Sequence, residues 1–244
     1  MYDRPANAAA HDRLWAAIRE GLRDRGIDAP DGLSRDVLYR DSWARDDLVL
    51  GQICVLPWKL RFEEQLTLIG ASDYGVDTCP PGFFNAVMLA RADDPRDTAA
   101  LFQSRFVANA RHSQSGYGAG RNFANRIGLR LPEPEITGAH DVSVQRVADG
   151  TADFCFVDAH TFWMQQQDLP AARACRVVHR TRPVPGQSLV TRKGADPAPF
   201  LAAIKQAIAA LATEDRAVLG LRDVIRLPDA AYDITIAEGV AFPG

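Results

Sequence analysis

The sequence predicts an α/β fold with two lobes and a ligand cleft between the lobes. Apolar runs of strand length alternate with helix-length segments along most of the 244-residue chain, which is typical of α/β proteins. Pro- and Asp-rich interruptions at 91–97 and 181–187 bracket an inserted middle block. We therefore expect lobe I to comprise 1–90 plus 187–244 and lobe II to comprise 91–186, each long enough to bury a core. A crevice between two such lobes is a natural ligand site.

The first expected element is an amphipathic helix at 8–25, because Leu14, Ile18 and Leu22 form one apolar stripe that Gly26 ends. Turn residues separate the later segments. The expected strands lie at 48–55, 66–71, 83–90, 105–110, 135–138, 152–157, 176–179 and 188–192. The further helices are expected at 98–103, 116–127, 141–149, 159–167 and 199–213. This alternation predicts parallel βαβ units.

The composition excludes several classes of protein. With 47% apolar and 24% charged residues, the chain is an ordinary globular sequence. The 28 basic and 31 acidic residues give a net charge of −3 without a Lys/Arg run, so no nucleic-acid partner is expected. No stretch approaches the ~18 apolar residues of a membrane span. The start shows no secretory leader, which predicts a cytoplasmic protein as written, or a periplasmic one if a signal precedes it.

Cysteine and histidine spacing indicates neither a metal nor a cofactor. The four cysteines contain no C-x-x-C pair, which argues against a zinc ribbon or a thioredoxin motif. The five histidines lack the H-x-H and H-x-x-x-H spacings of metal ligands. A disulfide between Cys54 and Cys79 stays open, because Cys54 ends an apolar strand and Cys79 lies in a Pro-Pro-Gly turn.

The segment 108–120 is the most informative part of the chain for chemistry. A strand ends there, a small polar loop turns, and a helix begins near Gly116. Because a helix N-terminus offers unpaired N–H donors and about half a positive charge, it favours an anion. The hydroxyls of Ser113 and Ser115 and the backbone N–H groups at 115–117 would hold that anion. The alternative is that Ser113 only caps the helix.

Two further polar residues stand at the ends of expected strands. His140 lies at a strand-to-helix junction, and Asp158 follows a buried strand. His140 could face a ligand, or it could be a capping or buried, hydrogen-bonded histidine. Asp158 could receive a cationic ligand group, or it could cap the next helix.

Six short motifs carry a family resemblance: Asp47-Leu48-Val49-Leu50-Gly51-Gln52, Asp73-Tyr74-Gly75, Ser113-Gln114-Ser115-Gly116, Gly138-Ala139-His140-Asp141, Ala148-Asp149-Gly150-Thr151-Ala152-Asp153 and Thr181-Arg182-Pro183-Val184-Pro185-Gly186. In this order they resemble the phosphate/phosphite/phosphonate-binding components of ABC transporters, which have the type 2 periplasmic-binding-protein fold. The resemblance implies a hinged solute-binding protein that grips a small phosphonate-, phosphite- or phosphate-like oxyanion for ABC-type uptake, and an ABC permease as its partner. It also implies a set of ligand-binding residues: Ser113, Gln114, Ser115, Gly116, His140 and Asp158, with Gln52 and Tyr74 from the other lobe.

An enzyme on the same fold is the main alternative. It would be a lyase of the menaquinone-pathway type or a pyrimidine-forming enzyme of thiamine synthesis, with His140 and Asp158 as acid and base. A Ser–His–Asp hydrolase lacks its G-x-S-x-G elbow. A cytosolic ligand sensor is a third possibility, although no helix-turn-helix is attached. We favour the binding protein, with no catalytic residue; turnover of a ligand would instead indicate the enzyme.

Overall fold

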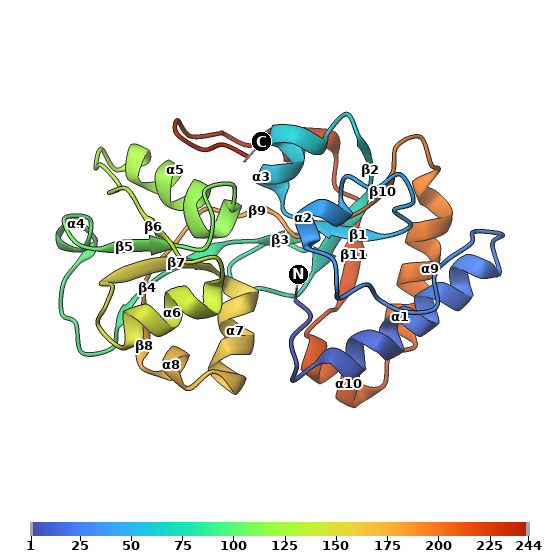
Figure 1. Ribbon diagram of the computed structural model, residues 1–244, viewed down its shortest axis with the longest axis horizontal. Helices are drawn as coiled ribbons and strands as arrows, with labels where there is room; N and C mark the ends of the chain where they lie inside the picture. Colours follow the sequence, from blue (N-terminus) through green and yellow to red (C-terminus); the bar gives the residue numbers. More distant parts are fainter. Residues whose placement is uncertain (1, 243–244) are drawn as a thin grey trace. The chain divides into compact units, whose positions relative to one another are not determined.

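The computed structural model describes residues 2–242 and divides the chain into two compact units (Figure 1). The first unit contains the chain up to Phe83 together with Pro185–Tyr232. The second contains Phe84–Val184 and the chain from Asp233 onward. The last residues therefore group with the second unit, whereas the sequence places them in the first lobe. Each unit is an α/β structure with its own sheet and core.

The first unit is built on a four-stranded sheet in which every neighbouring pair is antiparallel. In spatial order its strands are β1 (Gly51–Ile53), β10 (Ser188–Arg192), β2 (Leu66–Asp73) and β11 (Asp223–Ile225). The expectation of parallel βαβ units is therefore wrong for this unit. The long chain excursion between β2 and β10 allows both strands to enter the same sheet from different parts of the sequence.

Two helices, α1 (Ala8–Arg23) and α9 (Pro197–Ala209), supply most of the apolar core of the first unit. They approach closely, because a Cβ atom added to Gly21 would lie 3.1 Å from the Cβ atom of Ala203. The strand expected at 48–55 is shorter than predicted, because the chain turns into a helix after Cys54. The remaining helical segments of this unit are α2 (Tyr39–Ser42), α3 (Val55–Pro57), η1 (Trp58–Phe62), α10 (Thr213–Leu219) and η3 (Asp229–Tyr232).

The second unit has a five-stranded mixed sheet. In spatial order its strands are β6 (Glu135–Ile136), β5 (Phe106–Ala108), β7 (Phe154–Asp158), β4 (Ala86–Arg91) and β8 (Cys175–Arg180). Strand β5 runs parallel to both β6 and β7, whereas β4 is antiparallel to β7 and β8. The predicted parallel pairing is therefore confined to one side of this sheet. Where the chain changes unit, the short strands β3 (Phe83–Phe84) and β9 (Val184–Pro185) pair with each other.

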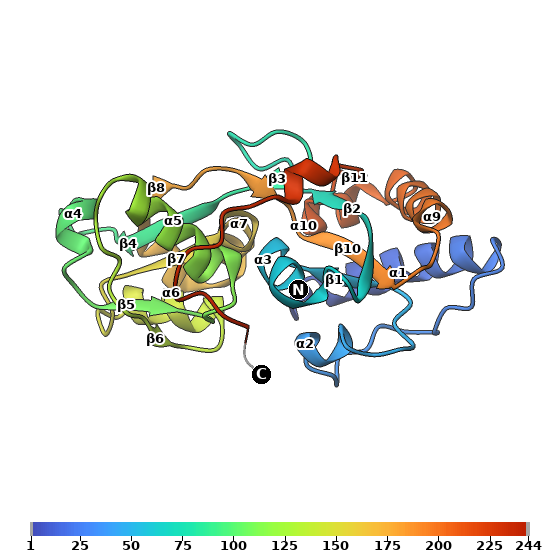
Figure 2. The same ribbon diagram turned by 90° about the horizontal axis from the view of Figure 1, so that it is seen from above.

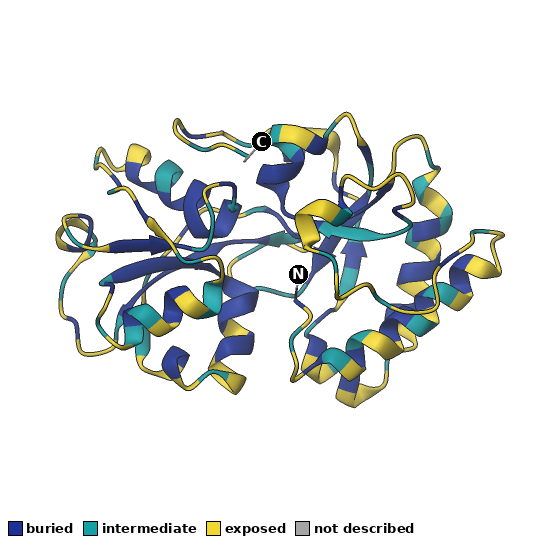
Figure 3. Cartoon of the chain, in the orientation of Figure 1, coloured by how far each residue is buried: buried dark blue, intermediate teal, exposed yellow. Residues whose placement is uncertain are grey.

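The central strands of the second unit's sheet are buried (Figure 3), and the core around them is rich in aromatic side chains. The rings of Phe106 and Phe154 stack with centroids 4.8 Å apart, and β4 and β7 are almost wholly buried. Gly120 permits a close approach, because a Cβ atom there would lie 2.8 Å from the ring of Phe156. The helical segments are α4 (Thr98–Leu101), η2 (Gln114–Gly118), α5 (Ala119–Arg126), α6 (His140–Ala148), α7 (Ala159–Asp168) and α8 (Pro170–Arg173).

Cross-links, metal sites and membrane spans are each absent from the part of the chain that the structure describes. None of the four cysteines forms a disulfide, so Cys54 and Cys79 are not bonded to each other. Within residues 2–242, no helix combines the length and the apolar character that crossing a bilayer requires. The same residues contain no cluster of three or more His, Cys, Asp or Glu side chains suited to a metal ion.

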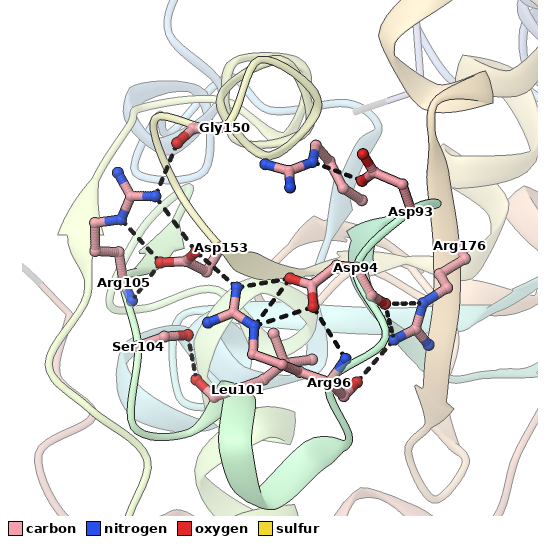
Figure 4. A network of polar contacts seen from close by, with 10 residues as sticks. Asp93, Asp94, Arg96, Leu101, Ser104, Arg105, Gly150, Asp153 and Arg176 are labelled. Atoms are coloured by element: carbon pink, nitrogen blue, oxygen red, sulfur yellow. Dashed lines mark hydrogen bonds and ion pairs between the residues drawn. The ribbon is translucent and has the colours of Figure 1, made fainter.

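A network of ion pairs joins three loops of the second unit (Figure 4). The carboxylate of Asp153 accepts hydrogen bonds from Arg96 Nη2 and Arg105 Nε, both at 2.8 Å. Arg96 also binds Asp94, whose backbone carbonyl accepts hydrogen bonds from Arg176. An open pocket of about 510 Å³ borders this network. Because Asp153 is only 13% exposed, we assign the network a stabilising role.

Replacing Asp153 by Asn should lower the free energy of unfolding by about 2 kcal/mol at pH 7, since charge-assisted bonds from two arginines are lost. The hydrogen bond from Arg105 holds the pKa of Asp153 below its ordinary value of 3.8. The stabilisation is therefore present above that value and lost as the pH falls through the folded-state pKa. Urea unfolding between pH 7 and pH 3 measures the difference from wild type, which should shrink on acidification.

The matched control is Asp93→Asn. Asp93 is 77% exposed, and it pairs with Arg91 next to Asp94 and Arg96 of the network. Solvent screens this exposed pair, so its loss should change the free energy of unfolding very little. Equal effects of the two substitutions at pH 7 would contradict the role assigned to Asp153.

Candidate functional site

Ser113 begins the helical segment that follows β5. Its backbone is extended, and its Oγ accepts a hydrogen bond from the N–H of Gly116 at 3.0 Å. Its carbonyl oxygen accepts from the N–H groups of Tyr117 and Gly118. The capping role considered for Ser113 is thus present in the structure. Of the backbone donors expected at 115–117, two already donate to Ser113.

Two other backbone donors are available at the same helix start. The N–H groups of Gln114 and Ser115 donate to no acceptor among the described residues. The first turn is a π-helix, η2, a geometry that occurs frequently at functional sites. It continues directly into α5, so the N–H groups lie at the positive end of a longer helical segment. This arrangement can accept the oxygen atoms of an anion.

Gly116 is required by its surroundings. A Cβ atom at this position would lie 1.8 Å from Asn109 Oδ1 and 3.2 Å from Ser113 Oγ. Asn109 therefore occupies the space that a side chain would need. Gln114 is buried as well: the residue is 2% exposed, and its Oε1 atom accepts no hydrogen bond from the described residues.

His140 is the first residue of α6 and contacts the segment Ser113–Gly116, here called the serine segment. Its Nε2 atom lies 3.2 Å from Ser115 Oγ, and either atom can donate, depending on the tautomer. Its Nδ1 atom is buried without a partner among the described residues. Burial lowers the pKa of His140 to about 4, although the carboxylate of Asp141 acts in the opposite direction. The imidazole is therefore neutral at pH 7 in the ligand-free protein.

Asp158 caps the helix that follows it. The residue is 1% exposed, and its Oδ1 accepts a hydrogen bond from the N–H of Thr161 at 2.8 Å. The structural role considered for Asp158 is therefore present. Because β5 and β7 pair in parallel, the end of β7 at Asp158 lies at the same edge of the sheet as the end of β5.

Gln52 and Tyr74 lie together in the first unit. Gln52 Nε2 donates to Tyr74 Oη at 3.2 Å and to Ser72 Oγ at 3.3 Å. The ring of Tyr74 meets the edge of the Tyr2 ring at a centroid distance of 4.8 Å. These side chains form one polar cluster on β1 and at the end of β2, so the structure does bring this predicted pair together.

The sequence did not predict that the C-terminal tail, residues 233–242, lies against α5 of the second unit (Figure 2). Asn122 Nδ2 donates to the carbonyl oxygen of Thr235 at 2.7 Å, and Arg121 Nη2 donates to that of Glu238 at 2.9 Å. The ring of Phe242 lies 4.9 Å from the ring of His112, directly before Ser113. Residues 233–242, which follow η3, form no helix or strand. No periodic sequence pattern could therefore have predicted where this tail lies.

The hydrogen bonds of the serine segment involve no cationic side chain. Among residues 2–242, the hydrogen bonds of Ser113, Ser115 and His140 join them to each other or to backbone groups. None of these bonds involves a Lys or Arg side chain. The nearby Arg111 donates to Glu133 at 2.8 Å. The site therefore presents hydroxyl, imidazole and backbone N–H groups, which are neutral donors suited to a small oxyanion.

The family model for the periplasmic phosphonate substrate-binding protein of ABC transporters matches residues 67–229. The chain belongs to this family of substrate-binding proteins, which confirms the resemblance found in the motifs. An enzyme on the same fold is therefore not supported. Among curated proteins, none matches the sequence.

Similar solved structures show the fold of two-lobed periplasmic binding proteins. XAC2383 from Xanthomonas citri, bound to chloride, is 18% identical with a TM-score of 0.68, over 93% of this chain and 90% of that one. PhnD1 from Prochlorococcus marinus, in complex with methylphosphonate, is 14% identical with a TM-score of 0.67, over 93% and 91%. A binding protein of an ABC phosphonate transporter from Pseudomonas aeruginosa is 14% identical with a TM-score of 0.64, over 90% and 77%. At these identities the likeness establishes the fold, as the sequence predicted.

Replacing Gly116 by Ala should destabilise the serine segment, because the new Cβ atom would overlap Asn109 Oδ1. We expect a loss of about 1–3 kcal/mol in the free energy of unfolding, measured by urea denaturation. The double variant Asn109→Ala/Gly116→Ala should recover most of this loss, since the overlapping atom is removed.

Gly32→Ala is the matched control, because a Cβ atom at Gly32 would meet no atom within 4 Å. Its effect should stay within about 0.5 kcal/mol. A Gly116→Ala variant as stable as this control would show that the close packing against Asn109 is absent in solution.

Proposed function

We propose that this chain is a solute-binding protein for a small oxyanion of the phosphonate, phosphite or phosphate class. The observation that carries the proposal is the contact between Ser115 and His140 beside two uncommitted N–H groups. In this proposal the segment Ser113–Gly116 surrounds the anionic head group, and His140 contacts it from the start of α6. Family membership supports the same ligand class.

The available donors are sufficient for useful affinity. Each hydrogen bond to a charged acceptor contributes roughly 1.5–3 kcal/mol, and a helix terminus adds about 0.3–1 kcal/mol. The donors are the N–H groups of Gln114 and Ser115, the hydroxyl of Ser113, and one donor from the bonded pair of Ser115 and the neutral His140 ring. After the cost of immobilising the ligand is subtracted, these contributions are large enough to allow micromolar binding.

Other predicted residues have secondary roles in this proposal. Asp158 receives a cationic group of an amino-alkyl ligand, while its other task is to cap α7. Gln52 and Tyr74, already joined by a hydrogen bond, are the contribution expected from the first unit. Delivery of the ligand to an ABC permease is part of the proposal, and membership of the family supports it.

Substitution of both serines tests the proposed site. Wild-type protein with methylphosphonate at about 100 times its Kd should gain ~2.7 kcal/mol of stability. The variant Ser113→Ala/Ser115→Ala should lose most of that gain, because two hydroxyl donors are removed. Without ligand it should lose only about 1 kcal/mol, the value of one helix cap. Thermal unfolding and isothermal titration calorimetry measure the two quantities.

Ser104→Ala is the control, because Ser104 lies in the same unit and its Oγ donates to the carbonyl oxygen of Leu101. This variant should bind methylphosphonate like wild type. Unchanged affinity in the double serine variant would show that the anion binds elsewhere.

A further inference from the structure

Gln165 is a fully buried polar residue whose task the ligand chemistry does not explain. It lies on α7 with an exposed fraction of 0%. Its Nε2 atom donates a hydrogen bond to Asp141 Oδ1 at 2.7 Å. A buried amide is costly unless its bonds stabilise something specific. The side chain therefore connects α7 to the first turn of α6.

Asp141 directly follows His140 in the first turn of α6. A carboxylate in that turn interacts favourably with the helix N-terminus, and Gln165 fixes its orientation. Because His140 and Asp141 share a helical turn, restraining one restrains the backbone of the other. The hydrogen bond from α7 therefore bears on where the imidazole of His140 lies.

The contacts continue from His140 to the serine segment. His140 Nε2 lies 3.2 Å from Ser115 Oγ, and the Nδ1 side of the ring is buried. Three elements are thereby joined in sequence: α7 through Gln165, α6 through Asp141 and His140, and η2 through Ser115. None of the six motifs includes Gln165.

We propose that Gln165 is a positioning residue of the oxyanion site, which holds Asp141 and the first turn of α6 so that His140 meets Ser115. This inference rests on the proposed function for its effect on ligand affinity. Its geometric part concerns the ligand-free protein and can be measured independently. Gln165 acts through the other residues and makes no ligand contact in this account.

Bond and charge at Asp141 can be separated by substitution. Gln165→Met preserves length and volume but removes the amide donor. Asp141→Asn keeps an oxygen acceptor for Gln165 and removes the charge. Asp141→Ala removes both the acceptor and the charge. Because Asp141 is only partly buried, this variant also tests the loss of the hydrogen bond if Gln165→Met does not fold. Gln167→Met is the matched control on the same helix, since Gln167 is exposed and its side-chain amide donates to the carbonyl oxygen of Trp163 within α7.

The first measurement is ¹H–¹⁵N NMR of the His140 ring in the ligand-free protein. Wild type, Asp141→Asn and Gln167→Met should show the same dominant neutral tautomer with a hydrogen-bonded Nε2. Gln165→Met and Asp141→Ala should show a mixture of tautomers. The pKa of His140 should fall in Asp141→Asn, because the one charge that raises it is gone.

The second measurement is the Kd for methylphosphonate by calorimetry. Gln165→Met and Asp141→Ala should bind about tenfold more weakly, the order of one weakened hydrogen bond, whereas Asp141→Asn and Gln167→Met should stay within about twofold. A Gln165→Met protein with an unchanged His140 ring signal would overturn the inference, whatever its melting temperature. Absence of methylphosphonate binding in wild type would count against the proposed function alone, since the ring signals still decide the positioning role.

Discussion

The parallel pairing of β5 with β6 and β7 is the constraint on which the serine site depends. Parallel neighbours end at the same edge of a sheet, so the chain leaves all three strands on one side. The pairing extends beyond the strands, because the N–H groups of Thr137 and Gly138 donate to the carbonyl oxygens of Ala108 and Asn109. These bonds bring the loop before His140 beside the loop before Ser113. The contact between His140 and Ser115 follows from that register.

Several charged residues of the second unit pair with one another and not with the side chains of Ser113, Ser115 or His140. Arg96 and Arg105 share Asp153, and Arg111 binds Glu133. The helix start is consequently left with neutral donors, and burial keeps His140 uncharged. In the proposed function, such a site would hold an anion through oriented dipoles and not through a counter-ion. Under that proposal, small displacements of those dipoles should weaken binding directly, which is the reason for assigning a positioning role to the buried Gln165.

Local signals in the sequence predicted the elements that depend on local chemistry. The apolar stripe of Leu14, Ile18 and Leu22 predicted α1, and Ser113 was correctly identified as a candidate cap. Strand direction could not be predicted, because it depends on how distant segments such as β2 and β10 enter one sheet. Gln165 was not predicted, because no sequence pattern distinguishes it. Its proposed role depends on a hydrogen bond to Asp141, which lies 24 positions away. The tail at 233–242 was missed for the same reason.

A crystal structure with methylphosphonate would test the central claim most directly, namely that neutral donors at the start of η2 hold the anion. The account predicts phosphonate oxygens within hydrogen-bonding distance, about 2.7–3.2 Å, of Ser115 Oγ and the N–H groups of Gln114 and Ser115. His140 should contact the same head group. A phosphonate bound elsewhere, for example against Arg176 in the open pocket, with the serine segment unoccupied, would contradict it.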